Sequence, residues 1–240
     1  MCYLPCQWSL AVILLLIIDI LLLKKIIMKT YKIAVIGGTG KSGQYLVRKL
    51  LEKGYSLKLL LRQPENFAPQ NPLIEMIKGD ARDETAICNL IEGTDLVMST
   101  LGQPKGEKSI FSDAAKNIIK AMNHYGSKRY IVTTGLSVNT ASDHKSERVK
   151  MATDWMYQNY PETTADKQKE YEFLLESNLD WTLVRLPLIH LTEENFPIET
   201  NLTDCKGEGI NAGDLAEFLV SQIENSEYIR ESPFLYNLKE

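Results

Sequence analysis

The sequence predicts a doubly wound α/β fold, in which helices cover both faces of a parallel sheet. Three observations predict it. Short apolar runs alternate with amphipathic helical patterns from Tyr31 onward. The first run, Ile33 to Ile36, is apolar throughout, as in a strand that is buried on both faces. A glycine-rich turn links this run directly to a helical pattern.

The elements follow one another along the chain. Strands are predicted at residues 31–37, 55–62, 73–80, 94–102, 128–135, 180–187 and 233–238. Helices are predicted at residues 43–54, 84–91, 110–126, 165–178 and 211–225. Gly54 and Gly126 end two of these helices, and Asp83 and Asn211 are expected to cap two others.

Two segments interrupt this alternation, the polar stretch 139–164 and the segment 188–209. Both follow the carboxyl ends of predicted strands, where open α/β sheets bind ligands. Long irregular segments at such places usually cover a site. We therefore predict one domain with a small lid formed by these two segments.

Composition excludes several other classes. The chain has 240 residues, of which 44% are hydrophobic and 24% charged, which is typical of a globular domain. The net charge of −4 offers no basic surface for nucleic acid. The cysteines lie far apart and lack metal-ligand spacing: Cys2, Cys6, Cys88 and Cys205. We expect no metal site, and a reduced, cytoplasmic location.

Residues 1–28 form an apolar leader before the predicted domain at 29–240. The apolar stretch from Leu10 to Leu23, broken only by Asp19, is shorter than the roughly 20 residues of a spanning helix. One interpretation is a leader absent from the working protein, because Met28 is a natural start just before the first strand. The other is a membrane anchor, with the lysines that follow it holding the domain on the cytoplasmic side. Contact with a membrane is expected only if the leader is retained.

The stretch "IAVIGGTGKSGQYL" allows two kinds of phosphate site. A nucleoside triphosphate loop would need a glycine where the chain has Val35, inside the predicted strand, so this interpretation fails. The remaining pattern is Gly37, Gly40 and Gly43. In a dinucleotide site these glycines allow a sharp turn, close approach to a pyrophosphate, and packing of the helix on the strand.

The end of the second predicted strand distinguishes NADP from NAD. An acidic residue there would accept the ribose hydroxyl of NAD, whereas an arginine suits the 2′-phosphate of NADP. The chain has Arg62 at this place and no acid before Glu65, and Lys41 could add a second positive charge. NADP(H) is therefore expected over NAD(H), although a solvated strand-end arginine would give the same sequence.

Seven segments together resemble the atypical short-chain dehydrogenase/reductase proteins, from residue 31 to about residue 236. They are "IAVIGGTGKSGQYLV", "LLLRQPENF", "IKGDARDETAI", "DLVMSTLG", "RYIVTTGLS", "SNLDWTLVRLP" and "GDLAEFLV". The nearest branch is the NAD(P)H-binding group that contains flavin/biliverdin-type reductases and NmrA-like redox sensors. The resemblance implies a Rossmann NAD(P)-binding fold.

The resemblance also implies roles for individual residues. Those matching cofactor-binding positions are Gly37, Thr39, Gly40, Lys41, Gly43, Arg62, Asp80, Ser99, Thr100, Leu101 and Gly102. Thr133 and Thr134 take the place of serines that face the nicotinamide, and Lys167 matches the family lysine that holds the ribose. These three are the candidate catalytic residues. The plainer interpretations are that the two threonines only bond backbone groups at the strand end, and that Lys167 lies on a solvent-exposed helix face.

The sequence departs from the wider superfamily at one position. The tyrosine acid that usually precedes the lysine by four residues is Thr163 here. Tyr157 or Tyr160 could replace it, but nothing in the sequence requires this. The departure argues against an alcohol dehydrogenase of the steroid or sugar type.

We therefore expect an NADPH-dependent reductase of a small conjugated acceptor, such as a flavin or a quinone. The alternative is a non-catalytic NAD(P)-binding redox sensor of the NmrA type, whose lid engages another protein. A third possibility, a membrane-tethered reductase, requires the leader. The sequence does not define the acceptor or the oligomeric state.

Overall fold

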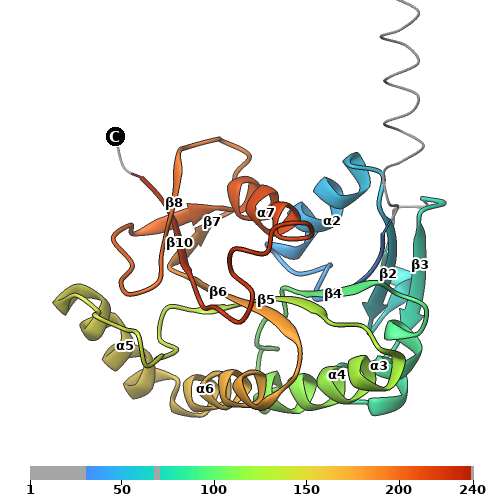
Figure 1. The fold of residues 1–240 in the computed structure, drawn as a ribbon, viewed down its shortest axis with the longest axis horizontal. Coiled ribbons are helices and arrows are strands. Elements are labelled where there is room, and N and C mark those ends of the chain that lie inside the picture. Colours follow the sequence, from blue (N-terminus) through green and yellow to red (C-terminus); the bar gives the residue numbers. More distant parts are fainter. Residues whose placement is uncertain (1–30, 68–70, 239–240) are drawn as a thin grey trace, which may run out of the picture. The chain divides into compact units, whose positions relative to one another are not determined.

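The fold is built on one eight-stranded sheet. The computed structural model describes residues 31–67 and 71–238. Neighbouring strands pair in parallel, except for the last strand, which runs antiparallel to its neighbour. The strand order is β3 (Ile74–Lys78), β2 (Ser56–Leu61), β1 (Lys32–Ile36), β4 (Leu96–Ser99), β5 (Arg129–Gly135), β6 (Asp180–Leu186), β10 (Phe234–Asn237) and β8 (Ile198–Asn201) (Figure 1).

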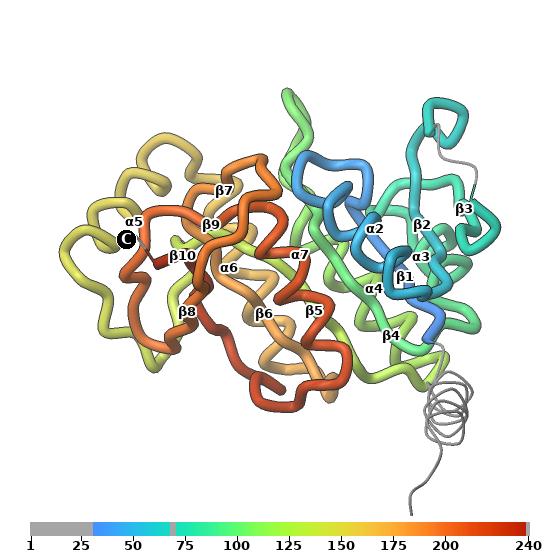
Figure 2. Tube along the Cα trace, turned by 90° about the horizontal axis from the view of Figure 1, so that it is seen from above, coloured from blue at the N-terminus to red at the C-terminus, as the bar shows by residue number. Residues whose placement is uncertain are grey.

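Helices cover both faces of this sheet. On one face α2 (Gly43–Glu52) lies beside α7 (Ala212–Ser221), as Figure 2 shows. The other face carries α3 (Glu84–Ile91), α4 (Phe111–Tyr125) and α6 (Pro161–Glu176) (Figure 1). Because successive strand residues point to opposite faces, Val35 of β1 packs in the core under α2 and α7, whereas Ile36 packs in the core under α3 and α4. The predicted doubly wound α/β fold is confirmed.

The strand order reverses at the centre of the sheet. β1 pairs with β2 on one side and with β4 on the other. The chain passes from β1 to β2 and β3 on one side and then returns to form β4 on the opposite side of β1. Open α/β sheets bind ligands in the crevice at the carboxyl ends of the strands at such a reversal. We therefore expect the ligand-binding residues among those that follow β1, β2, β3 and β4.

The structure differs from the sequence-based expectation in segment 139–164. This segment was expected to be irregular, but α5 (Glu147–Asn159) occupies its middle, and α6 begins at Pro161. The buried residues of α5 are Val149 and Thr153, so the helix has little of the apolar periodicity that reveals a helix in a sequence.

The segment 188–209 also contains regular structure. It includes β7 (Leu188–His190) and β8, and β7 pairs with β9 (Gly209–Asn211) in a small second sheet. β8 extends the main sheet beyond β10. The role of both segments as a lid stays a prediction.

Helix capping agrees with the sequence in one place and differs in another. Asp83 caps α3, as predicted, by accepting hydrogen bonds from its first turn. Asn211 precedes α7, but its side chain donates to the carbonyl of Glu194 at 2.9 Å instead of capping the helix. Asp214, in the first turn of α7, accepts from the backbone N–H of Phe196 at 3.2 Å. Both side chains thus tie the segment after β7 to α7.

Within residues 31–67 and 71–238, no helix has the length and apolar character needed to cross a membrane. The predicted leader at 1–28 lies outside the described residues, as does the question of a membrane anchor.

Candidate dinucleotide-binding site

The glycine turn after β1 is packed so tightly that two of its glycines have no space for a side chain. Gly37 has a φ of +77°, and a Cβ there would lie 2.7 Å from the carbonyl carbon of Thr100. A Cβ on Gly43 would overlap the carbonyl oxygen of Gly37. The N–H of Gly40 and the hydroxyl of Thr100 donate to that same oxygen, at 2.9 and 3.3 Å. The turn is therefore held against the end of β4.

The amino end of α2 follows this turn and suits an anion. Ser42 is its N-cap residue, and among the described residues no side chain caps this end of the helix. The N–H groups of Gln44 and Tyr45 already donate to the carbonyls of Gly40 and Ser42, at 3.2 and 3.1 Å, so the N–H groups that precede Gln44 present the partial positive charge of this helix end. Lys41, just before Ser42, adds a full positive charge nearby. This combination binds phosphate in many nucleotide-binding folds.

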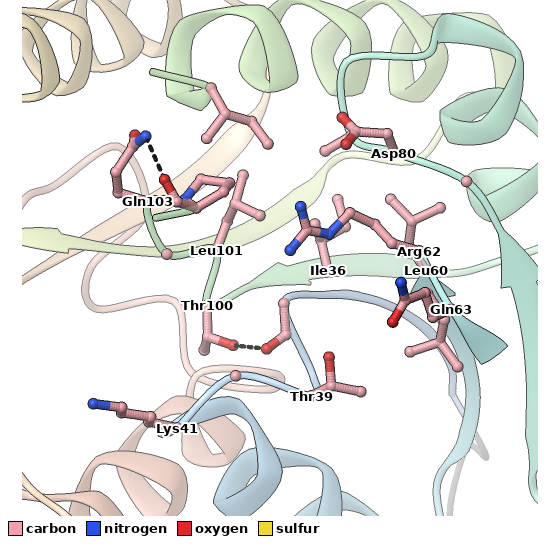
Figure 3. Close-up of a pocket in the computed structure, with 18 of the residues that line it drawn as sticks. Ile36, Thr39, Lys41, Leu60, Arg62, Gln63, Asp80, Thr100, Leu101 and Gln103 are labelled. Carbon is pink, nitrogen blue, oxygen red and sulfur yellow. Dashed lines mark hydrogen bonds between the residues drawn. The ribbon is translucent and has the colours of Figure 1, made fainter. Parts of the chain in front are cut away.

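A cavity of about 810 Å³ lies at the carboxyl ends of β1 to β4 (Figure 3). Its volume falls in the range of sites for small molecules and cofactors. Most of the residues predicted to bind the cofactor line it: Gly37, Thr39, Gly40, Lys41, Arg62, Asp80, Thr100, Leu101 and Gly102. Two others are not among the described lining residues. Gly43 packs beneath Gly37, and the hydroxyl of Ser99 accepts from the N–H of Leu101 at 3.4 Å.

Several residues of this cavity were not predicted from the sequence. They are Ile36, Ser42, Leu60, Leu61, Gln63, Asn66, Phe67, Ala81, Gln103, Pro104 and Ile110. Most of them flank a strand end that was predicted from the sequence. Their position after a strand could therefore have identified them as lining residues. Gln103 belongs to the loop after β4, whose path has no sequence signature.

Arg62 extends from the end of β2 into the cavity (Figure 3). Its Nη1 donates to Oε1 of Glu107 at 2.8 Å, and Nη2 of Arg82 donates to Oε2 of the same carboxylate at 2.7 Å. Arg82 also forms a two-pronged ion pair with Asp80, at 2.8 Å for each contact. The hydrogen bonds from Arg82 lower the pKa of Asp80 to about 2. Asp80 is thus fixed as an anion at the cavity wall.

The three candidate catalytic residues are not among the described lining residues of this cavity. Thr133 donates to the carbonyl of Ser99 at 3.4 Å, and the buried hydroxyl of Thr134 has no partner within the described part of the chain. Lys167 lies beside the end of β5, since a Cβ on Gly135 would be 3.8 Å from its Nζ. Burial lowers the pKa of this ammonium group. The structure therefore gathers all three residues around the end of β5.

Arg185 is fully buried in β6. Its guanidinium donates to Asp143 at 2.6 Å, to the carbonyl of Leu202 at 2.9 Å and to that of Ser232 at 2.8 Å. It therefore joins three loops around the end of the sheet. The residue positions both segments that were predicted as a lid.

Glu170, which precedes the last turns of α6, is buried, and its Oε2 has no hydrogen-bond partner among the described residues. Burial raises its pKa to about 8, and the nearby Lys167 only partly opposes this shift. The stability that the neutral carboxyl contributes is therefore fully present below about pH 4.5 and is lost as the pH rises to about 8.

We expect the free energy of unfolding to fall across this window, by at most about 1.4 kcal/mol per pH unit. Glu170→Gln keeps the shape and cannot ionise, so it should flatten this dependence. Urea denaturation of both proteins at several pH values measures the effect. Parallel pH profiles of the two proteins would contradict it.

Among the residues that the structure describes, no group of three or more His, Cys, Asp or Glu side chains could hold a metal ion.

The sheet reversal, the glycine turn and the cavity together define a dinucleotide-binding α/β protein. The chain belongs to a family described as NAD(P)H-binding, whose model matches residues 37–226. The predicted membership of an NAD(P)H-binding family is thereby confirmed.

Curated relatives match only part of the chain. An isoflavone reductase homologue from Nicotiana tabacum is 34% identical over 110 residues, which cover 42% of this chain and 34% of that protein. An uncharacterised protein from Mycobacterium tuberculosis is 29% identical over 123 residues, 51% of this chain and 13% of that protein. The match therefore spans about a third or less of these relatives' length.

Solved structures show the same fold over most of the chain. A short-chain dehydrogenase/reductase from Veillonella parvula in complex with NADP has a TM-score of 0.72 at 17% identity, covering 86% of this chain and 94% of that one. The anaerobillin reductase ChuY from Escherichia coli has a TM-score of 0.69 at 19% identity, covering 87% and 99%. Both likenesses concern the fold.

Proposed function

We propose that this protein is an NADPH-dependent reductase of a small conjugated acceptor of the flavin or quinone type. The observation that carries the proposal is Arg62, whose side chain reaches into the cavity from the end of β2. An acidic residue at this place would favour NAD, whereas an arginine accommodates the 2′-phosphate of NADP. Family membership supports an NAD(P)H cofactor, and Arg62 supports the phosphate-bearing form.

The residues of the cavity fit such a cofactor. The uncapped amino end of α2 and Lys41 would bind the pyrophosphate, with Gly40 allowing the phosphates to approach the backbone. Arg62 would hold the 2′-phosphate by charge-assisted hydrogen bonds. Ile36 and Leu101 supply apolar walls that exclude water.

Hydride transfer to such an acceptor needs little from the protein beyond positioning the cofactor and the acceptor. Bound NADPH supplies the hydride, and a flavin or quinone accepts this hydride together with one proton. Lys167 holds an ammonium group beside Gly135, and the hydroxyl of Thr134, which has no partner among the described residues, is a second donor at the end of β5. Such an acceptor takes the proton on a heteroatom that solvent can reach. The threonine at 163 is therefore compatible with turnover.

Relatives support this class of activity. An isoflavone reductase homologue and an anaerobillin reductase are both similar to this chain, and both are named as reductases.

The alternative is a non-catalytic redox sensor of the NmrA type, which Thr163 favours because it leaves no tyrosine acid four residues before Lys167. A sensor would bind the nucleotide and leave it unoxidised in the presence of acceptors.

The test is NADPH oxidation by the full chain, followed by absorbance, with FMN, FAD and a series of quinones. Gly40→Ala is the matched control, because its Cβ would stand between the turn and the phosphates but would meet only the carbonyl of Gly37, at 3.1 Å. We expect at least one acceptor to accelerate oxidation in the wild-type protein but not in the control. Equal rates in both proteins would contradict the reductase, and binding without turnover would favour the sensor.

A further inference from the structure

Arg62 is already paired in the structure. Glu107, on the loop after β4, accepts from Arg62 through one oxygen and from Arg82 through the other. These three side chains come from segments that follow β2, β3 and β4. One carboxylate thus bridges two arginines at the part of the cavity where the 2′-phosphate is proposed to bind.

The loop that carries Glu107 is held in place by a residue of the cavity itself. The side-chain amide of Gln103 donates to the carbonyl of Pro104 at 3.1 Å (Figure 3). It also donates to the carbonyl of Glu107 at 2.8 Å. The N–H of Glu107 donates to the carbonyl of Pro104 at 3.3 Å, and Gly106 has a φ of +75°, which closes the turn. The position of the Glu107 backbone is therefore fixed relative to the cavity wall.

We propose that Glu107 is an internal competitor of the 2′-phosphate and sets the nucleotide selectivity of this site. In the free protein its carboxylate occupies Arg62. NADPH binds when its 2′-phosphate displaces the carboxylate from Arg62, while NADH offers no group that can do so. The inference rests on the proposed NADPH site and adds the residue that regulates it.

The strengths of the two interactions allow this exchange. The side chains of Arg62 and Glu107 are 58% and 36% exposed, and exposed ion pairs contribute only about 0–1 kcal/mol. A phosphate monoester carries about 1.5 to 2 negative charges near neutral pH and offers three acceptor oxygens. It therefore binds a guanidinium better than a single carboxylate does.

Arg82 explains why the displaced carboxylate stays nearby. Its Nη2 donates to Asp80 as well as to Glu107, so Glu107 keeps one arginine partner after it leaves Arg62. The charge of Glu107 then remains close to the bound phosphate and repels it. Glu107 thus weakens NADPH binding in two ways, by competition before binding and by repulsion after it.

The experiment compares the wild-type full chain, Glu107→Gln and Glu65→Gln by titration with NADPH, NADH and adenosine 2′-monophosphate. Glu65 is an exposed acid in the segment after β2, outside the cavity lining among the described residues, and its change removes the same charge. Glutamine at 107 keeps the side-chain shape but cannot compete as an anion.

We expect Glu107→Gln to lower the Kd for NADPH and for adenosine 2′-monophosphate about 5-fold and to change the Kd for NADH less than about 2-fold. Glu65→Gln should show neither change. An equal change for both dinucleotides would mean that Glu107 only shapes the loop and would overturn the inference. So would an equal gain in Glu65→Gln. If the wild-type protein prefers NADPH but Glu107→Gln changes nothing, the competitor role fails while the NADPH site stands. If the wild-type protein binds neither nucleotide, the proposed function itself fails.

Discussion

Arg62→Ala is expected to raise the Kd for NADPH about 50-fold and to leave the Kd for NADH within about 2-fold. The guanidinium would otherwise make charge-assisted hydrogen bonds to the 2′-phosphate, which contribute roughly 1.5 to 3 kcal/mol. NADH has no 2′-phosphate, so it loses nothing when the arginine is removed. Titration followed by nicotinamide fluorescence gives both constants.

Arg48→Ala is the matched control for this experiment. Arg48 is an exposed arginine of α2 that pairs with Glu193, and it is absent from the described lining of the cavity. It should leave both constants unchanged. If Arg62→Ala weakened NADPH and NADH equally, Arg62 would be a general contributor to the site and would not select the phosphate.

Gly37→Ala is expected to lower the free energy of unfolding by about 3 kcal/mol. The residue has a φ of +77°, which is unfavourable for alanine, and the new Cβ would lie 2.7 Å from both the carbonyl carbon and the carbonyl oxygen of Thr100. Backbone atoms cannot move aside as the end of a side chain can, so the turn and the end of β4 must separate. Urea denaturation measures the loss.

Substitutions at two other glycines distinguish effects on stability from effects on nucleotide binding. Gly102→Ala meets no atom within 4 Å, so its stability should match that of the wild-type protein. Gly40→Ala should cost less than about 1 kcal/mol of stability but should abolish tight nucleotide binding, because only the phosphates need its open face. A Gly37→Ala protein as stable as the Gly102→Ala protein would contradict the packing argument.

The sequence predicted the features that depend on neighbouring residues. The glycine turn and its place after the first strand follow from local geometry, since glycine adopts the positive φ of Gly37 far more readily than other residues do. The cap by Asp83 is equally local, because its oxygen reaches the first turn of its own helix.

Features that depend on distant segments were not predicted. The pairing of Arg62 with Glu107 joins residues 45 positions apart, and it exists because the loop after β4 folds back over the end of β2. Asn211 has the right residue type for a cap, but it bonds Glu194 of a segment that tertiary structure brings to it. α5 escaped prediction because a helix with so few buried residues has almost no hydrophobic pattern.

The candidate catalytic residues show the same limit. The sequence placed Thr133 and Thr134 at a strand end and Lys167 on a helix, and the structure brings them to one end of β5. The structure also shows that Glu170 is buried, which no sequence pattern indicated, since acidic residues on helices are usually exposed.

The most direct test is the titration of NADPH and NADH into the full wild-type chain, followed by nicotinamide fluorescence. We expect saturable binding of both nucleotides with a clear preference for NADPH, because the glycine turn and α2 hold the pyrophosphate and Arg62 holds the 2′-phosphate. Binding of neither nucleotide would contradict it, because the glycine turn would then be only a structural connection between β1 and α2.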